Sequence, residues 1–166
     1  ALVPAETSRD SFTHFVVYTS SALAEQTTPT AVEFYDTESL VSHVSFADFD
    51  LDVGDLGGDL VWREPNDTIH ITHYVVYMAA SHHGLQRLLM GNATVGQETF
   101  FVPPETQILN YTHFLVYALS DLALQTTPAA TRILDRSARV YDITLIDWDL
   151  DELEIGGPPY WRPPGD

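Results

Sequence analysis

Acidic residues at alternate positions are the side chains of this sequence best suited to chemistry. Two runs carry them, "DFDLDVGDLGGD" and "DWDLDELEIGG", and their carboxylates belong to Asp48, Asp50, Asp52, Asp147, Asp149 and Asp151. This spacing is typical of calcium loops, in which the backbone curls around the ion and alternate oxygens converge. In an extended strand the same side chains would stand about 6.6 Å apart, too far to share one ion. Two interpretations stay open: a calcium loop, or charges that keep a sheet edge from pairing.

Three Asn-x-Thr triplets are potential sites of N-linked glycosylation. They are "NDT" at Asn66, "NAT" at Asn92 and "NYT" at Asn110. An acceptor asparagine must be accessible, and the strand pattern described below places all three in loops. We therefore expect at least one N-linked glycan, and hence an extracellular or cell-surface location.

One face of the apolar segments at residues 70–79 and 111–119 is too apolar for an ordinary solvated surface. Alternation along a strand sends Tyr74 and Phe114 into the core. The residues of interest on the opposite face are His73, Tyr77, His113, Leu115 and Tyr117. A two-histidine metal site across these strands lacks a third ligand at suitable spacing. We interpret the face as cross-strand pairs that a neighbouring domain, subunit or glycan covers.

The other polar residues form no catalytic pattern. The chain has no cysteine, and its many carboxylates have no evident base, phosphate-binding loop or nucleophile elbow beside them. His82 and His83 fall in an expected loop with no partner indicated by spacing. We expect no enzymatic activity, and no cofactor other than calcium or N-linked glycans.

The charge of the chain limits its partners. Lys and Arg number 7 against 24 Asp and Glu, and the net charge of −17 would repel nucleic acid and anionic lipid. No run of about 18 apolar residues is present to insert into a bilayer. The remaining partners are copies of the chain, adjacent repeats of the same chain, and glycans.

An internal repeat organises these residues. "THFVVY" at residues 13–18 returns as "THFLVY" at 112–117, an offset of 112−13 = 99. "QTTP", "DFDLD" and "WREP" have counterparts at the same offset, in "QTTP", "DWDLD" and "WRPP". A period of this length matches one mid-sized domain, so 166 residues cannot hold two complete copies.

The segments between turn residues predict strands and no convincing helix. They are short and rich in Val, Ile, Phe, Tyr and Thr, and they lie near residues 40–50, 58–65, 70–79, 85–91, 98–106, 111–119 and 128–135. Gly57 and Gly58 are expected to form the turn into the second strand. Seven strands in about a hundred residues predict an all-β, Ig-like β-sandwich.

The order "LVWREP", "ITHYVVYMA", "FFVPPET" and "YTHFLVYALSD" resembles the fibronectin type III pattern. The phrases "THYVVYMA" and "THFVVYTSSALAEQTTP" are similar to units of very long cell-surface tandem-repeat proteins of unicellular eukaryotes. The resemblance covers essentially the whole chain. It implies that residues 70–79 form strand C and residues 111–119 form strand F, which are antiparallel neighbours in this fold.

On this map, residues 1–35 are the C-terminal half of one repeat, 36–134 a complete repeat, and 135–166 the N-terminal half of the next. We expect the chain to continue into further repeats or to meet copies of itself head to tail. The first hypothesis is a structural component of a glycosylated extracellular array or filament, packed head to tail and laterally. The alternative is a calcium-dependent cell-adhesion or recognition ectodomain.

Overall fold

The computed structural model describes residues 2–165, and it confirms the all-β class predicted from the sequence, because no helix occurs among these residues. No described segment could therefore cross a membrane as a helix. The strands are β1 (His14–Val17), β2 (Thr30–Glu33), β3 (Ser42–Phe46), β4 (Asp55–Arg63), β5 (Ile71–Ala79), β6 (Leu88–Thr94), β7 (Thr99–Gln107), β8 (His113–Ser120), β9 (Ala129–Arg132), β10 (Tyr141–Leu145) and β11 (Pro159–Arg162).

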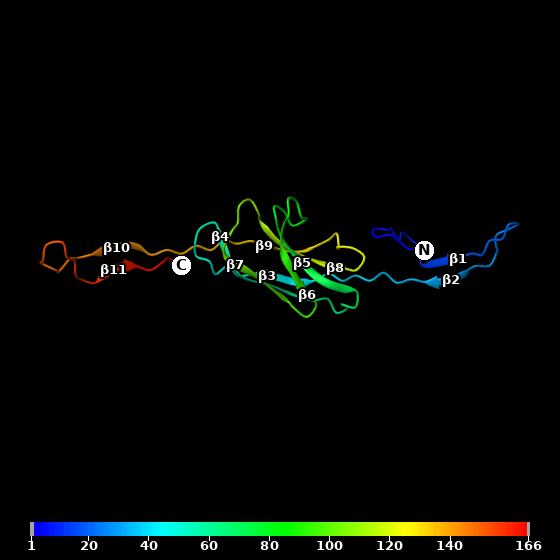
Figure 1. Ribbon diagram of the computed structural model, residues 1–166, viewed down its shortest axis with the longest axis horizontal. Helices are drawn as coiled ribbons and strands as arrows, with labels where there is room; N and C mark the ends of the chain where they lie inside the picture. Colours follow the sequence, from blue (N-terminus) through cyan, green and yellow to red (C-terminus); the bar gives the residue numbers. More distant parts are fainter. Residues whose placement is uncertain (1, 166) are drawn as a thin grey trace.

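Strands β3 to β9 form the central body of the molecule (Figure 1). One sheet has the order β3-β4-β7 and the other the order β6-β5-β8-β9, and every pairing in both sheets is antiparallel. The two sheets share one hydrophobic core. This arrangement is compatible with a β-sandwich.

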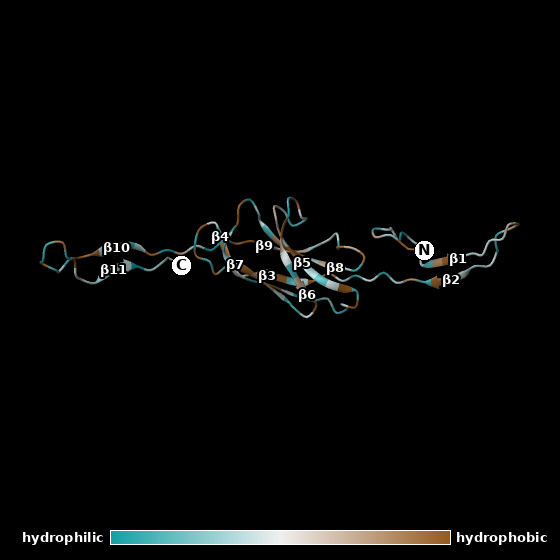
Figure 2. Cartoon of the chain, in the orientation of Figure 1, coloured by the Kyte–Doolittle hydropathy of each residue, from teal (hydrophilic) through white to brown (hydrophobic). Residues whose placement is uncertain are grey.

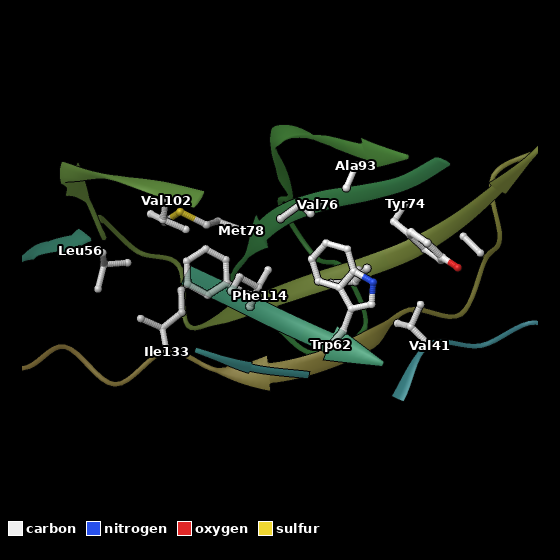
Figure 3. Close-up of a cluster of buried hydrophobic side chains, with 13 residues drawn as sticks. Val41, Leu56, Trp62, Tyr74, Val76, Met78, Ala93, Val102, Phe114 and Ile133 are labelled. Atoms are coloured by element: carbon white, nitrogen blue, oxygen red, sulfur yellow. The ribbon is translucent and has the colours of Figure 1, made fainter. Parts of the chain in front are cut away.

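Alternation along the strands produces that core. On β5, Tyr74, Val76 and Met78 are buried, and on β8 Phe114 and its alternate neighbours are buried as well. The facing sheet contributes the fully or nearly fully buried side chains of Leu56, Trp62 and Val102 (Figure 3), together with Leu60. The core residues expected from the period-two pattern are thus confirmed.

Gly57 and Gly58 lie inside β4, so the turn predicted for them is wrong. Gly58 has φ +146°, and a Cβ built on it would lie 2.5 Å from the carbonyl oxygen of Ala47. Glycine is needed here because β4 passes against the chain that leaves β3, and a side chain would force the two apart.

Two hairpins, β1–β2 and β10–β11, extend from opposite ends of the central body (Figure 1). Their Cα pairings repeat those of the central strands at an offset of 99 residues, as 113−14 = 99 shows for the first pair. The β1–β2 pairs match the β8–β9 pairs, and the β10–β11 pairs match the β3–β4 pairs. Corresponding pairs include His14–Glu33 with His113–Arg132, and Tyr141–Arg162 with Ser42–Arg63.

The same apolar side chains are buried in the central body and exposed in the hairpins. Phe15 on β1 is 45% exposed, whereas its counterpart Phe114 on β8 is 0% exposed. Trp161 on β11 is 57% exposed, whereas Trp62 on β4 is 4% exposed. Figure 2 shows hydrophobic stretches on β1, β2 and β10. Within the described residues, therefore, the hairpins lack the facing sheet that covers their counterparts.

One end of the core holds two polar atoms without hydrogen-bond partners among the described residues. They are Trp62 Nε1 and the hydroxyl oxygen of Tyr74, whose rings meet edge to face at 5.8 Å between centroids (Figure 3). Burial, and then the negative charge of Glu64, raises the pKa of Tyr74 above its ordinary value. The Glu64 carboxylate acts on this hydroxyl without forming a hydrogen bond to it, and a buried hydroxyl without a partner costs free energy because its lost hydration is not replaced.

We therefore predict that Tyr74→Phe increases the free energy of unfolding by about 1 kcal/mol, since it removes the unpartnered hydroxyl and keeps the ring. Urea denaturation followed by tryptophan fluorescence measures the change. Tyr117→Phe is the matched control, because this ring is also buried but its hydroxyl is not among the unpartnered atoms. A loss of stability in Tyr74→Phe would show that the hydroxyl has a partner.

Candidate functional site

The first acidic run forms a curled loop between β3 and β4. Asp48, which is 5% exposed, accepts hydrogen bonds at Oδ1 from the backbone N–H groups of Asp50 and Gly57, at 3.2 and 3.0 Å. Asp50 Oδ1 in turn accepts from the N–H of Asp52 at 3.1 Å. Each carboxylate thus closes a small turn with the residue two positions later, and this repeated closure bends the backbone.

The bend gathers three carboxylates, but they are not the three that the sequence suggested. Oxygens of Asp50, Asp52 and Glu105 lie within 4.8 Å of one another. Glu105 comes from β7, and its N–H donates to Asp50 Oδ2 at 2.8 Å. Asp48 is directed into the protein instead, and Glu105 is the third carboxylate of the group. The signal for Glu105 was present, because "VPPET" repeats the "VPAET" at residues 3–7.

The second acidic run repeats this geometry in the β10–β11 hairpin. Asp147 Oδ1 accepts from the N–H groups of Asp149 and Gly156, both at 2.9 Å. Oxygens of Asp149, Asp151 and Glu154 lie within 4.8 Å of one another, again without Asp147. The loop keeps its shape even though Leu153, at φ +67°, stands at the place of Gly54, at φ +91°.

Charge within the central cluster, formed by Asp50, Asp52 and Glu105, is unbalanced. The carboxylates of Asp50, Asp52 and Asp55 raise the pKa of Glu105 above its ordinary value. Hydrogen bonds from the N–H groups of Glu105 and Asp52 hold the pKa of Asp50 below its ordinary value. Exposed carboxylate oxygens that repel one another suit a hard divalent cation such as calcium, which would need further oxygens from water or backbone to reach its usual six to eight.

The three sequons differ in their setting. Asn66 lies between β4 and β5, and Asn110 lies in a turn between β7 and β8, as expected. Asn92 lies inside β6, so its predicted loop position is wrong. β6 is the outermost strand of its sheet, and all three side chains are exposed. Each asparagine therefore keeps the accessibility that glycosylation requires.

The chain itself covers much of the outer face of β5 and β8. Leu115 and Tyr117 are buried, with Tyr77 and Leu124 packed against them. The guanidinium of Arg87 lies 4.8 Å from the ring centroid of Tyr77 and 5.1 Å from that of Tyr117, close enough for cation–π attraction. Leu115 and Tyr117 are thus covered by the chain itself and not by a partner. Of the five residues predicted to form an interface, the half-buried His73, Tyr77 and His113 remain candidates.

The structure does not bring His73 and His113 together. His73 pairs with Leu119 and His113 with Ala79, toward opposite ends of the β5–β8 ladder. The neighbour of His113 is His82, with ring centroids 5.9 Å apart, and the His82 ring packs at a tilt against the His83 ring, with centroids 3.7 Å apart. Sequence spacing missed this contact because it depends on the path of the loop between β5 and β6.

The setting of His113 produces a pH dependence. Burial, and then the positive charges of His82 and Arg132, lowers the pKa of His113 below its ordinary value near 6.5. The folded state therefore binds this proton less readily than the unfolded state does. Stability from this source is complete above about pH 6.5 and is lost as the pH falls toward the lowered pKa.

We predict that His113→Gln flattens the decline in free energy of unfolding between about pH 7 and 5.5, since glutamine does not titrate. Denaturant titrations at several pH values measure the slope. His14→Gln is the control, because it lies at the corresponding place on the exposed strand β1 and should leave the slope unchanged. Equal slopes for His113→Gln and the unmodified protein would contradict the prediction.

Comparisons with known proteins add no identification. No family model, curated protein or solved structure matches this chain.

Proposed function

We propose that this chain is part of a glycosylated, extracellular array of tandem β-sandwich repeats with a structural role. The repeats are of the Ig-like, fibronectin type III-like kind, with a period of 99 residues. The observation that carries the proposal is the hairpin pairing: β1–β2 and β10–β11 reproduce the registers of β8–β9 and β3–β4. A chain with further repeats, or copies of this chain placed head to tail, would present such strands again and again.

The strand arrangement supports the Ig-like type. Seven strands divide into sheets of three and four, and β5 pairs with β8 as strands C and F do in this fold. Trp62 lies on β4, the second strand of the central body, and fills the core. The proposal therefore assigns residues 36–134 to one complete repeat, with parts of two others at 1–35 and 135–166.

The open edges of the hairpins support an assembled state. β8 pairs with β9 on one side and β5 on the other, whereas β1 pairs with β2 alone. In the same way, β4 pairs with β3 and β7, whereas β11 pairs with β10 alone. Unpaired strand edges favour pairing with another strand, and exposed aromatic rings favour burial, because apolar surface in water is unfavourable. Strands like β5 and β7 from a neighbouring repeat or copy would satisfy them.

We predict that the 166-residue chain associates as its concentration rises, and that Phe15→Asp weakens this association. The substitution places a charge where the counterpart Phe114 is enclosed in the core. Light scattering over a wide concentration range, with negative-stain microscopy, measures assembly. Phe101→Asp is the matched control, because Phe101 is an exposed ring of the central body, and it should not change assembly. If the chain stays a compact monomer at every concentration, the proposed filament assembly is wrong.

A second candidate function is a calcium-dependent cell-adhesion ectodomain. The two acidic clusters favour it, because each gathers three carboxylates within 4.8 Å. Asp149 and Asp151 stand 99 residues after Asp50 and Asp52, whereas the third member, Glu154, corresponds to Asp55 and not to Glu105. Bound cations at these places would neutralise acidic loops along the array.

If this candidate is correct, calcium should raise the melting temperature relative to a chelator, since a ligand that binds the folded state stabilises it. Asp50→Asn combined with Asp52→Asn should remove most of that shift, because it takes two ligands from the central cluster. Asp59→Asn, at an exposed acid of β4 outside both clusters, should keep it. If the melting temperature of the unmodified protein is the same with calcium and with chelator, the calcium-dependent function is wrong.

A further inference from the structure

The segment between β9 and β10 is bound by the acidic loop at the start of β4. The N–H of Arg136 donates to Asp48 Oδ2 at 2.9 Å. The N–H of Ala138 donates to the carbonyl oxygen of Leu51 at 3.0 Å. In the other direction, Asp135 Oδ2 accepts from the N–H of Gly54 at 2.9 Å. Residues far apart in sequence thus form a continuous set of hydrogen bonds.

Asp48 is the centre of this contact. Among the described residues it is the one charged side chain that is buried. Burying a carboxylate is unfavourable unless hydrogen bonds replace its hydration, and Asp48 accepts three backbone N–H groups. Of these donors, Asp50 belongs to the loop, Gly57 to β4 just after it, and Arg136 to the linker. One side chain therefore orders the loop and holds the linker together.

We propose that this loop is a clamp that binds the linker leaving its own domain and so sets the direction of the next domain, a role that rests on the proposed tandem array. Ile133 is still part of the core, and β10 begins at Tyr141. The clamp engages Asp135, Arg136 and Ala138, which leaves residues 139–140 free before β10. A free linker would bend over its whole length, whereas a clamped one can bend only at its last two residues.

The parts of the clamp recur at the repeat offset. Asp147 stands 99 residues after Asp48, since 147−48 = 99, and Asp36 stands 99 before Asp135, since 135−36 = 99. The Asp147 loop is folded in the same way, with Oδ1 holding Asp149 and Gly156. Its Oδ2, the atom that would hold a linker, makes no hydrogen bond to any described residue. That loop has the form of the clamp without its linker.

Asp48→Asn tests the clamp selectively. The remaining oxygen of asparagine can still accept from Asp50 and Gly57, but its NH₂ group would face the N–H of Arg136, and two donors cannot bond. Amide hydrogen exchange reads each contact separately. In the unmodified chain we expect protection at Arg136 and Ala138. In Asp48→Asn their exchange should accelerate about tenfold or more, while the Gly57 amide stays protected.

Asp147→Asn is the matched control, because it makes the same substitution in a loop that holds no linker, and exchange at Arg136 should not change. If Asp48→Asn unfolds the domain, Asp135→Ala replaces it: this removes the bond to Gly54 and leaves the buried carboxylate intact. It should accelerate exchange at Arg136 and Ala138 while the β5 and β8 amides remain protected.

Small-angle scattering provides the global readout, since a released linker should broaden the distribution of distances between the central body and the β10–β11 hairpin. Unprotected Arg136 and Ala138 amides in the unmodified chain would overturn the proposal. Protection that survives both Asp48→Asn and Asp135→Ala would also overturn it. These contacts lie within one chain, so the result is independent of whether copies assemble, and a failure of the array proposal would be distinguishable from a failure of the clamp.

Discussion

The pairing of β5 with β8 is the contact on which the rest of the domain depends. These strands lie side by side inside the four-stranded sheet, and the side chains on both of their faces are buried or half-buried. Tyr74 and Phe114 fill the core between the sheets, while Leu115 and Tyr117 fill a second cluster outside it. The importance of the pairing is visible in β1, which repeats the sequence of β8 without a partner like β5 and exposes the corresponding side chains on both faces.

Polar groups at the margins of this core are treated in two ways. Asp48 is buried and accepts three backbone donors, so that its charge orders a loop. The Tyr74 hydroxyl and Trp62 Nε1 are buried without partners among the described residues. The Asp48 carboxylate fixes the positions of its backbone donors, because loss of any of these hydrogen bonds would leave a buried charge less well satisfied. The second is tolerated because the large rings bury enough apolar surface to offset it.

The sequence was sufficient for features that depend on local periodicity. Alternation along the strands predicted that Tyr74 and Phe114 are core residues, and both are buried. The Asp-x-Asp-x-Asp spacing predicted a loop capable of gathering carboxylates. The sequence was insufficient for contacts between segments that lie far apart along the chain. Glu105 replaces Asp48 in the acidic cluster because β7 passes beside the loop, and Arg87 covers Tyr117 because the loop between β5 and β6 folds back. Asn92 was misplaced because strand ends carry weak signals.

The acidic composition explains why hydrogen bonds from backbone N–H groups to carboxylates recur throughout the molecule. With 24 acids and 7 Lys or Arg, most carboxylates have no basic partner, and one ion pair, Asp142–Arg162 at 3.2 Å, forms among the described residues. Backbone N–H groups and a few side-chain hydroxyls are the remaining donors, and Asp48 and Asp135 use backbone N–H groups at the junction. Such bonds tolerate sequence change on the donor side, because every residue except proline supplies an N–H. A junction built this way requires two aspartates and a fixed backbone path, while the other linker side chains can vary.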